Sequence, residues 1–301
     1  MGTIKPTGDL GFKKILASHN HQRVTQGFIA DFFGLKVRLA DIHIADPYSI
    51  KSYQERLGAD EAGIQQRLHE TIRDVTVAVK NVDITVEMQI RTERHFVARA
   101  YYYLADRYTS HYREDPSVGR NKYASLRPVW SLNVLDGSVF DCAHAFHMFA
   151  FTDPDTGEAL TPPLARFGFL ELDKHKRDTA PARRRWRRFL KTGIVYQSDP
   201  SYLKEAASII DYDNLTQEER DMDKRLQKAI DTREAEMAYA IEQGVAQGIA
   251  QGIAQGVRER QLSDARAALR WGVPREGVVA ITGLDASAVD GLAQELGFAG
   301  S

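Results

Sequence analysis

The chain has 301 residues, with 40 Lys and Arg against 41 Asp and Glu, and therefore a formal net charge of -1. This balance predicts no global attraction to nucleic acid, so any basic binding site must be local. The single cysteine, Cys142, excludes an intrachain disulfide and is typical of a reducing compartment. Because residues 1–6 lack the apolar core of a signal peptide and no apolar run is long enough to span a membrane, we expect a cytoplasmic protein without a membrane segment.

The first 40 residues predict a helical beginning. Apolar residues recur at helical spacing in two stretches, 12–16 and 28–33. A polar segment at 51–70 then leads to two short runs with a different period. The chain therefore begins with helices and passes to strands.

The two runs, 74–79 and 83–90, alternate apolar and polar residues and predict a β-hairpin. A turn at Lys80 and Asn81 suits the hairpin, because Asn tolerates turn conformations. A slip of one residue would set valines against the polar face, so the two apolar faces support one register. This register places Asp74 directly opposite Glu87.

The opposition of two acids needs an explanation, because directly opposed residues have Cβ atoms about 4.5 to 5.5 Å apart and like charges there repel. A hard divalent cation would offset the repulsion, lower the pKa of a bound water and suit phosphodiester hydrolysis. Asp74 and Glu87 are two candidate ligands, and the carbonyl of Met88 is a third. Gln89 is a candidate to orient water or phosphate. The alternative is an amphipathic hairpin whose polar face meets solvent.

Further elements follow the hairpin in an order typical of an α/β or α+β core. Residues 96–112 show helical spacing, and residues 128–135 predict a buried strand. Two more strand-like runs lie at 145–152 and 167–172. The sequence therefore predicts a sheet with helices on its faces.

The segment 174–191 contains nine Lys or Arg against one acid. Five arginines surround Trp186: Arg183, Arg184, Arg185, Arg187 and Arg188. Such a patch is typical of a site for the nucleic-acid backbone. The alternative is a solvated helix with Trp186, Phe189 and Leu190 toward the core. The two interpretations are compatible if the arginines face outward.

The tail changes character at 242–257, where glycine recurs every four residues. In a helix, Gly244, Gly248, Gly252 and Gly256 would form a stripe beside Val245, Ile249, Ile253 and Val257. Each glycine costs about 1 kcal/mol of helix propensity against alanine, so we expect a partner helix to compensate. This predicts a homo-oligomer through the glycine-repeat helix. A flexible low-complexity linker is the alternative.

Residues 269–296 predict two short helices joined at Gly283, in the style of a helix-turn-helix. The second of these, at 286–296, contains no Lys or Arg. We therefore expect packing or oligomerisation here and no reading of DNA bases.

Several motifs occur in the order of a known family. They are Pro6-Thr7-Gly8-Asp9, Phe12-Lys13-Lys14, Asp74, Glu87-Met88-Gln89, Arg99-Ala100-Tyr101-Tyr102-Tyr103, 123–128, 134–136, Glu171-Leu172-Asp173-Lys174 and the glycine-repeat tail. In this order the chain resembles the recombination-promoting nuclease (Rpn) family, which is grouped with transposases of the PD-(D/E)XK nuclease superfamily. The resemblance covers most of residues 5–195 and extends loosely into the tail.

The resemblance implies an α/β (α+β) fold: a restriction-endonuclease-like core with a central mixed sheet flanked by helices, followed by a helical C-terminal tail. We expect a nuclease-like domain at 1–200, a helical region with the glycine repeat at 201–257 and a small helical element at 258–301. The implied activity is metal-dependent DNA cleavage associated with recombination or mobile elements. Mg²⁺ is the first candidate cation, with Mn²⁺ and Ca²⁺ as alternatives.

The resemblance also suggests roles beyond the acid pair. Asp9 resembles an upstream acidic residue of such sites, and its alternative is a helix N-terminal acid. Arg99 is a candidate phosphate contact, because it lies on the helix that in this superfamily packs beside the site. Tyr102 and Tyr103, on the same helix, are expected to be core or groove residues.

The chain departs from the superfamily pattern at Gln89, where the name pattern ends in lysine. An amide cannot place a positive charge beside the phosphate. Lys13 or Lys14 is a candidate to supply that charge, although an exposed helix lysine is the commoner role. Gln89 therefore motivates a second hypothesis: a catalytically inactive DNA-binding or oligomeric assembly protein that retains the nuclease fold.

Overall fold

A computed structural model of the chain describes residues 2–57, 75–89, 95–114, 122–174 and 180–298. The chain forms two compact units, Met1–Ala229 and Ile230–Ser301. None of the helices in these ranges combines the length and apolar character that a membrane span requires.

The first unit is built on a mixed sheet with the strand order β1-β2-β3-β4-β6-β5. Its strands are β1 (Ile42–Ile44), β2 (Val75–Val79), β3 (Val82–Gln89), β4 (Val129–Leu135), β5 (Phe146–Ala150) and β6 (Ala165–Glu171). β3, β4 and β6 run parallel, while the other pairs are antiparallel. The carboxyl ends of β3, β4 and β6 therefore lie at one edge of the sheet, where β2 begins.

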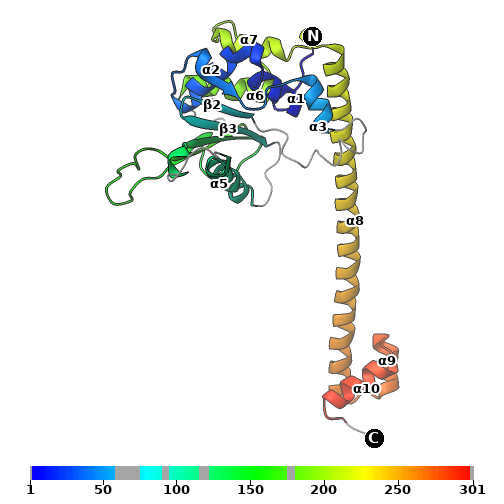
Figure 1. The fold of residues 1–301 in the computed structure, drawn as a ribbon. Coiled ribbons are helices and arrows are strands. Elements are labelled where there is room, and N and C mark those ends of the chain that lie inside the picture. The colour runs from blue at the N-terminus through cyan, green and yellow to red at the C-terminus, as the bar shows by residue number, and fades with distance from the viewer. Residues whose placement is uncertain (1, 58–74, 90–94, 115–121, 175–179, 299–301) are drawn as a thin grey trace. The chain divides into compact units, whose positions relative to one another are not determined.

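Helices cover both faces of this sheet. They are α1 (Asp9–Leu16), α2 (Gln22–Phe33), α3 (Ile50–Leu57), α5 (Phe96–Glu114), α6 (Pro181–Thr192) and α7 (Ser201–Ile209), with short 3-10 turns η1 (His19–His21), η2 (Leu39–Asp41), η3 (Lys122–Ser125) and η4 (Tyr212–Asn214). Helices α1, α2, α6 and α7 lie on one face, and α5 lies on the other (Figure 1). The α/β fold with a central mixed sheet is the predicted one.

The hairpin has the predicted register along β2. Val75 pairs with Val86 and Val79 with Val82, around a turn in which Lys80 has φ 52°. The valines of β2 are buried at alternate positions, which confirms their shared face. Asp74 lies outside the described residues, so its opposition to Glu87 stays a prediction.

The other strands and the first two helices also occur where their patterns predicted them. Every residue of β4 is buried, as expected for a central strand. The sequence pattern does not reveal strand β1, because it has only three residues. The segment 51–70, which the sequence identifies only as polar, begins with helix α3. Of the two positions expected for the tyrosines of α5, core or groove, the core position is wrong. Tyr102 is 63% exposed, because Phe96 and Ala100 occupy the buried stripe of the helix.

Helix α8 (Gln217–Arg270) begins in the first unit with a capping box. The Thr216 amide donates to the Glu219 carboxylate, and the Glu219 amide donates to the Thr216 hydroxyl. Lys14 of α1 donates to the same carboxylate at 2.7 Å. The start of α8 is therefore attached to the core of the first unit.

The second unit contains the glycine repeat, which is helical as predicted and lies within α8. Helices α9 (Arg275–Thr282) and α10 (Ala286–Glu295) follow and meet at Gly283, whose φ of 69° ends α9. Their apolar residues pack with the end of α8 into a separate core that includes Leu269, Val278 and Leu292. The predicted pair of short helices is thus confirmed.

Candidate functional site

Glu87 is held on the inner face of β3, toward α5, and only 7% of it is exposed. Alternation along β3 turns Val86 and Met88 into the opposite core, so Glu87 must point to the α5 side. Arg99 of α5 approaches it, with Nη2 4.0 Å from Oε1. The structure thus brings together two predicted site residues, an acid and a candidate phosphate contact.

Asn133 lies beside Glu87 and was not predicted from the sequence. The two are Cα partners in the parallel pair β3–β4, so their side chains share a face. Asn133 is buried, and its Nδ2 donates to the Gly168 carbonyl at 2.9 Å. The amide oxygen is the acceptor of this side chain, which shares the α5 face with Glu87. The available signal was an asparagine inside the otherwise apolar run 132–135.

The remaining hairpin candidates are placed only in part. Gln89 ends β3 with its Cα beside Leu135, and its side chain lies outside the described part. The side chain of Met88 is buried in the core, while a role for its carbonyl stays a prediction. The structure does not describe Asp74.

Asp9 and Lys13 are both buried on α1, although charged residues are seldom buried unless paired. Asp9 accepts a hydrogen bond from the Tyr53 hydroxyl. The Lys13 ammonium lies 3.6 Å from Asp46. Since the amide of Ala45 donates to Thr76 in β2, this ion pair lies near the start of β2. Both α1 residues therefore belong to the sheet edge that carries Glu87.

Glu171 ends β6 at the same edge and is fully buried. It accepts hydrogen bonds from the amides of Val139 at 2.5 Å and Phe140 at 3.1 Å, from Ser138 at 3.0 Å and from Lys174 at 2.7 Å. Burial raises the pKa of Glu171, but these hydrogen bonds outweigh it and hold the pKa below its usual value. The carboxylate is thus a stable anion that fixes the loop after β4.

Helix α6 reaches this edge through Lys191. Its ammonium is 2.5 Å from Asp136, which follows β4, and 2.7 Å from Asp173, which follows β6. Hydrogen bonds to Asp136 and Asp173 raise the pKa of Lys191. The end of the basic helix is therefore tied to the carboxyl ends of β4 and β6.

The arginines of α6 surround a buried face, as predicted: Trp186, Phe189 and Leu190 are in the core. Arg183 stacks on the ring of Phe146 at 3.9 Å, and Arg188 donates to Asp199. Arg184 is exposed, while Arg183, Arg185, Arg187 and Arg188 are partly exposed. Their proposed contact with DNA stays a prediction.

The pKa of Asp199 falls below its usual value, although burial alone would raise it. The Tyr196 amide and the Arg188 guanidinium donate to the carboxylate and outweigh that effect. Arg188 is therefore committed to a local ion pair.

A divalent cation fits the chemistry of the Glu87 position, because carboxylate and amide oxygens are the donors that Mg²⁺ takes. Glu87 and Asn133 supply such oxygens side by side on neighbouring strands. Within the ranges that the structure describes, no group of three His, Cys, Asp or Glu side chains is placed to hold a metal ion. A complete metal site at this position requires a further ligand, and Asp74 remains the predicted one.

Comparison with known proteins gives one match. A family model described as PD-(D/E)XK nuclease family transposase covers residues 6–240. No curated protein and no solved structure matches the chain. The matched range includes the whole sheet and the first 24 residues of α8.

Proposed function

The chain belongs to the PD-(D/E)XK nuclease family transposases, and from this premise we propose that it is a metal-dependent DNA endonuclease that hydrolyses phosphodiester bonds. The observation that carries the proposal is the buried Glu87 carboxylate facing Arg99, beside Asn133 on the next strand. Carboxylate and amide oxygens suit a divalent cation, and a guanidinium suits a phosphate.

In the proposed reaction, Asp74, Glu87 and the Met88 carbonyl bind the cation, with Mg²⁺ as the first candidate and Mn²⁺ or Ca²⁺ as alternatives. A bound divalent cation supplies an activated water and stabilises charge that develops on the phosphate. Gln89 positions the water or the phosphate by hydrogen bonds. Arg99 donates to the phosphate.

The α1 residues support this arrangement from the other side of the hairpin. We infer that Asp9 and Lys13 adjust the charge near the start of β2, because both are buried and both have partners in 46–53. Lys13 is then a source of the positive charge that Gln89 cannot supply. Its ammonium lies close to Asp46. In the proposal it therefore does not contact the reacting phosphate and stabilises the negative charge there through its electrostatic potential.

DNA reaches this site along α6 in the proposal. The helix carries five arginines around Trp186, and Lys191 ties its end to the sheet edge where β3 also ends. Arg183, Arg184, Arg185, Arg187 and Arg188 then contact the backbone, which needs no base sequence. Arg188 is paired with Asp199, so its contact with DNA competes with that ion pair.

Nicking of supercoiled DNA tests the activity, with Mg²⁺, Mn²⁺ and Ca²⁺ in separate reactions. Asp74→Ala and Glu87→Gln should each lower the rate by about 100-fold or more, since ligand loss removes several kcal/mol of transition-state stabilisation. Calorimetric titration with Mn²⁺ should show weaker binding in both variants. Glu158→Gln, which changes an exposed loop carboxylate, is the matched control.

Two outcomes of the nicking assay would count against the proposal. If Asp74→Ala nicks DNA at the wild-type rate, Asp74 is not a ligand of a catalytic cation. If the wild type cleaves no DNA with any of the three cations but binds DNA, the second hypothesis of an inactive assembly protein is favoured.

One observation supports assembly in addition to cleavage. Val245, Ile249, Ile253 and Val257 of α8 are each more than half exposed. A Cβ added at any of the four repeat glycines would meet nothing within 4 Å. Such an apolar face beside a flat glycine surface suits close packing against another helix. We propose a second copy of α8 as the partner.

Charge favours an antiparallel pair of α8 helices. Residues 230–243, before the repeat, contain four acids and one arginine, whereas residues 258–271, after it, contain four arginines and two acids. An antiparallel arrangement brings the acidic flank of each copy to the basic flank of the other.

A further inference from the structure

Helix α5 carries tyrosines at three consecutive positions, and these differ in their partners. Tyr101 packs on Phe167 of β6, with ring centroids 6.0 Å apart. Among the described residues, Tyr102 and Tyr103 make a ring contact only with each other, at 5.7 Å. Tyr102 is 63% exposed and Tyr103 is 38% exposed. Both rings are therefore open to a molecule that approaches α5 from solvent.

Helical geometry sets these two tyrosines beside the candidate cleavage site. Arg99 lies with Nη2 4.0 Å from Glu87 Oε1, and 29% of the arginine side chain is exposed. Tyr102 and Tyr103 follow Arg99 by three and four residues, so the three side chains lie on one face of α5 about one turn apart. We term these three residues the Arg–Tyr face. It begins at the residue that contacts Glu87.

The charges on this part of α5 suit an anionic partner. Asp106 lies one turn beyond the tyrosines, but Arg113 donates to its carboxylate at 2.7 Å and balances its charge. Arg99 places a cation at the end of the Arg–Tyr face that is nearer to Glu87. The face thus joins one cation to two exposed aromatic rings. A nucleotide has the two matching parts, a phosphate and a flat base.

The exposed rings distinguish unpaired from paired DNA. In a duplex, the neighbouring base pairs cover both faces of each base, so an aromatic side chain can stack only on a base that has left the stack. A duplex offers its phosphates and the edges of its bases instead. Aromatic rings beside a phosphate-binding cation are typical of sites for single-stranded DNA, where stacking tolerates any base.

We propose that the Arg–Tyr face binds an unpaired stretch of DNA next to the cleaved bond, with bases stacked on Tyr102 and Tyr103 and a phosphate bound by Arg99. The inference rests on the proposed function, because it names the form of DNA that the Glu87 site receives. The substrate is then DNA with an unpaired segment, such as a flap, a gap or a melted end. Helix α6 lies on the other face of the sheet and can bind the duplex part (Figure 1).

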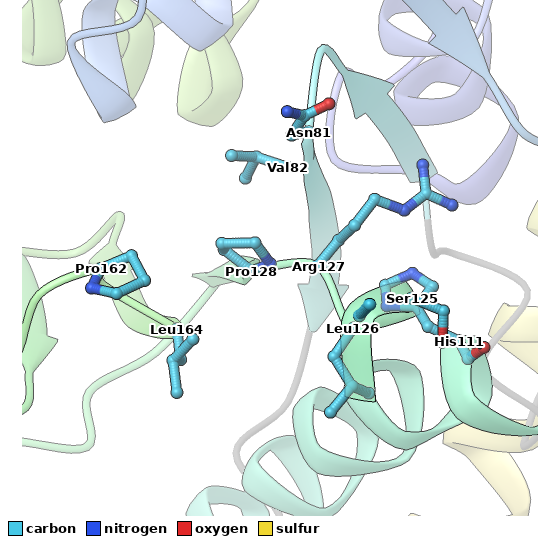
Figure 2. A pocket seen from close by; sticks show the side chains of 10 residues that line it. Asn81, Val82, His111, Ser125, Leu126, Arg127, Pro128, Pro162 and Leu164 are labelled. Atoms are coloured by element: carbon cyan, nitrogen blue, oxygen red, sulfur yellow. Dashed lines mark hydrogen bonds between the residues drawn. The ribbon is translucent and has the colours of Figure 1, made fainter. Parts of the chain in front are cut away.

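The opposite end of α5 lies away from Glu87 and supplies a control residue. There His111 Nε2 is 2.9 Å from Asp83, which is four residues from Glu87 on the same extended strand, about 13 Å. A pocket of about 900 Å³ occurs at this end, and His111 and Ser125 of η3 belong to its lining (Figure 2). Tyr123, also in η3, is 74% exposed. It offers an accessible tyrosine outside the Arg–Tyr face.

Fluorescence anisotropy tests the proposal with a labelled single strand of about 12 nucleotides and with the same sequence as a duplex. The full chain is used with a chelator, so that neither cleavage nor cation binding contributes. The double variant Tyr102→Ala, Tyr103→Ala should weaken binding of the single strand by about tenfold or more and leave binding of the duplex unchanged. Alanine is the best helix former, so α5 should be retained.

Two further variants separate stacking from other effects. Tyr102→Phe, Tyr103→Phe keeps both rings and removes both hydroxyls, so it should bind the single strand as the wild type does. Tyr123→Ala removes an exposed ring at the other end of α5 and should leave both affinities unchanged. A 2-aminopurine base in the strand reports stacking through the quenching of its fluorescence, which should be weaker with the alanine double variant.

Three results would overturn the proposal. The first is a wild type that does not bind the single strand, or an alanine double variant that binds it equally well. The second is an equal loss of affinity for the duplex, because paired bases cannot stack on the rings. The third is a phenylalanine double variant as weak as the alanine one, because the hydroxyls and not the rings would then bind.

Light scattering and the nicking assay separate this proposal from its neighbours. A smaller mass of the alanine double variant with unchanged affinity for the single strand would make the Arg–Tyr face a contact between proteins and would also overturn the proposal. A wild type that shows the expected binding but nicks no DNA with any of the three cations would contradict the proposed cleavage alone and would support the Arg–Tyr face as a site for unpaired DNA.

Discussion

Three buried carboxylates on the α5 side of the sheet differ in their partners. Asp83 is hydrogen-bonded to Arg107 and His111, and Glu171 to Lys174 and two backbone amides. Glu87 lies 4.0 Å from Arg99 Nη2 and beside Asn133 of β4. Asp83 and Glu171 fix elements of the fold through these partners, whereas Glu87, in the motif Glu87-Met88-Gln89, is the proposed cation ligand.

The Asp83 ion pair predicts a dependence of stability on pH. Burial raises the pKa of Asp83, but hydrogen bonds from His111 and Arg107 outweigh it and leave the pKa lowered. A lowered pKa means that the folded state binds the proton less readily than the unfolded state. The stabilisation is therefore complete above about pH 5 and is lost as the pH falls below about 4, through the lowered pKa.

Asp83→Asn should lower the free energy of unfolding near pH 7 by on the order of 2 kcal/mol, because Arg107 loses its charged partner. Urea unfolding of variant and wild type from pH 7 to pH 3 measures the difference, which should shrink below about pH 4. Asp106→Asn, which breaks an exposed ion pair on the same helix, should have little effect at any pH. A constant Asp83 difference down to pH 3 would contradict the prediction.

At the scale of elements, α8 differs along its length, because its first turn contacts the first unit whereas its glycine repeat is exposed. Its first turn is stabilised by the Thr216 and Glu219 capping box and by Lys14 of α1. Burial alone would raise the pKa of Glu219. Hydrogen bonds from Lys14, Thr216 and Tyr48 outweigh this effect, so the pKa lies below its usual value and the capping carboxylate stays ionised. Among the described residues, those of the glycine repeat are all exposed, so we expect its stability to depend on a partner.

The double variant Gly248→Leu, Gly252→Leu tests the proposed pair of α8 helices. Leucine favours a helix over glycine by roughly 0.8 kcal/mol at each position, so the helix itself should be strengthened. If the glycines allow two helices to approach, the variant should have a smaller mass by light scattering. Ala246→Leu, Ala250→Leu places the same side chains about 160° around the helix and is the matched control. An unchanged mass in the glycine variant would exclude this contact.

At the scale of the whole molecule, the two units have separate hydrophobic cores. The first surrounds the sheet and includes Val86, Leu132 and Trp186, while the second joins the end of α8 to α9 and α10. Because the second core contains few residues, it should be the less stable of the two. We expect the units to open independently.

Leu292→Ala tests this independence. Leu292 is buried in the second core, and its truncation should cost about 2–5 kcal/mol there. Hydrogen exchange followed by mass spectrometry should show faster exchange in α9 and α10 and no change in β3 or β4. Ile281→Ala, at an exposed position of α9, should change neither. Loss of protection in β4 together with α10 would show that the two cores unfold as one.

The sequence alone determined the features that depend on residues close together in the chain. Alternation over 75–89 specified the hairpin register, because a shift of one residue exposes every valine. Helical spacing and the four-residue repeat indicated α1, α2 and α8, and the order of motifs indicated the family. For the candidate site, it named Glu87 and Arg99, which the fold brings together.

Only the tertiary structure decided which distant residues meet. Parallel pairing of β3 with β4 sets Asn133 beside Glu87, and Lys191 reaches Asp136 from 55 residues away. The meeting of Asp83 with Arg107 and His111 depends on how α5 packs across the sheet. No local period encodes such contacts, because they follow from strand order and from the packing of helices on faces. That is why the acids of the hairpin were visible in the sequence, whereas the asparagine beside them and the pocket behind them were not.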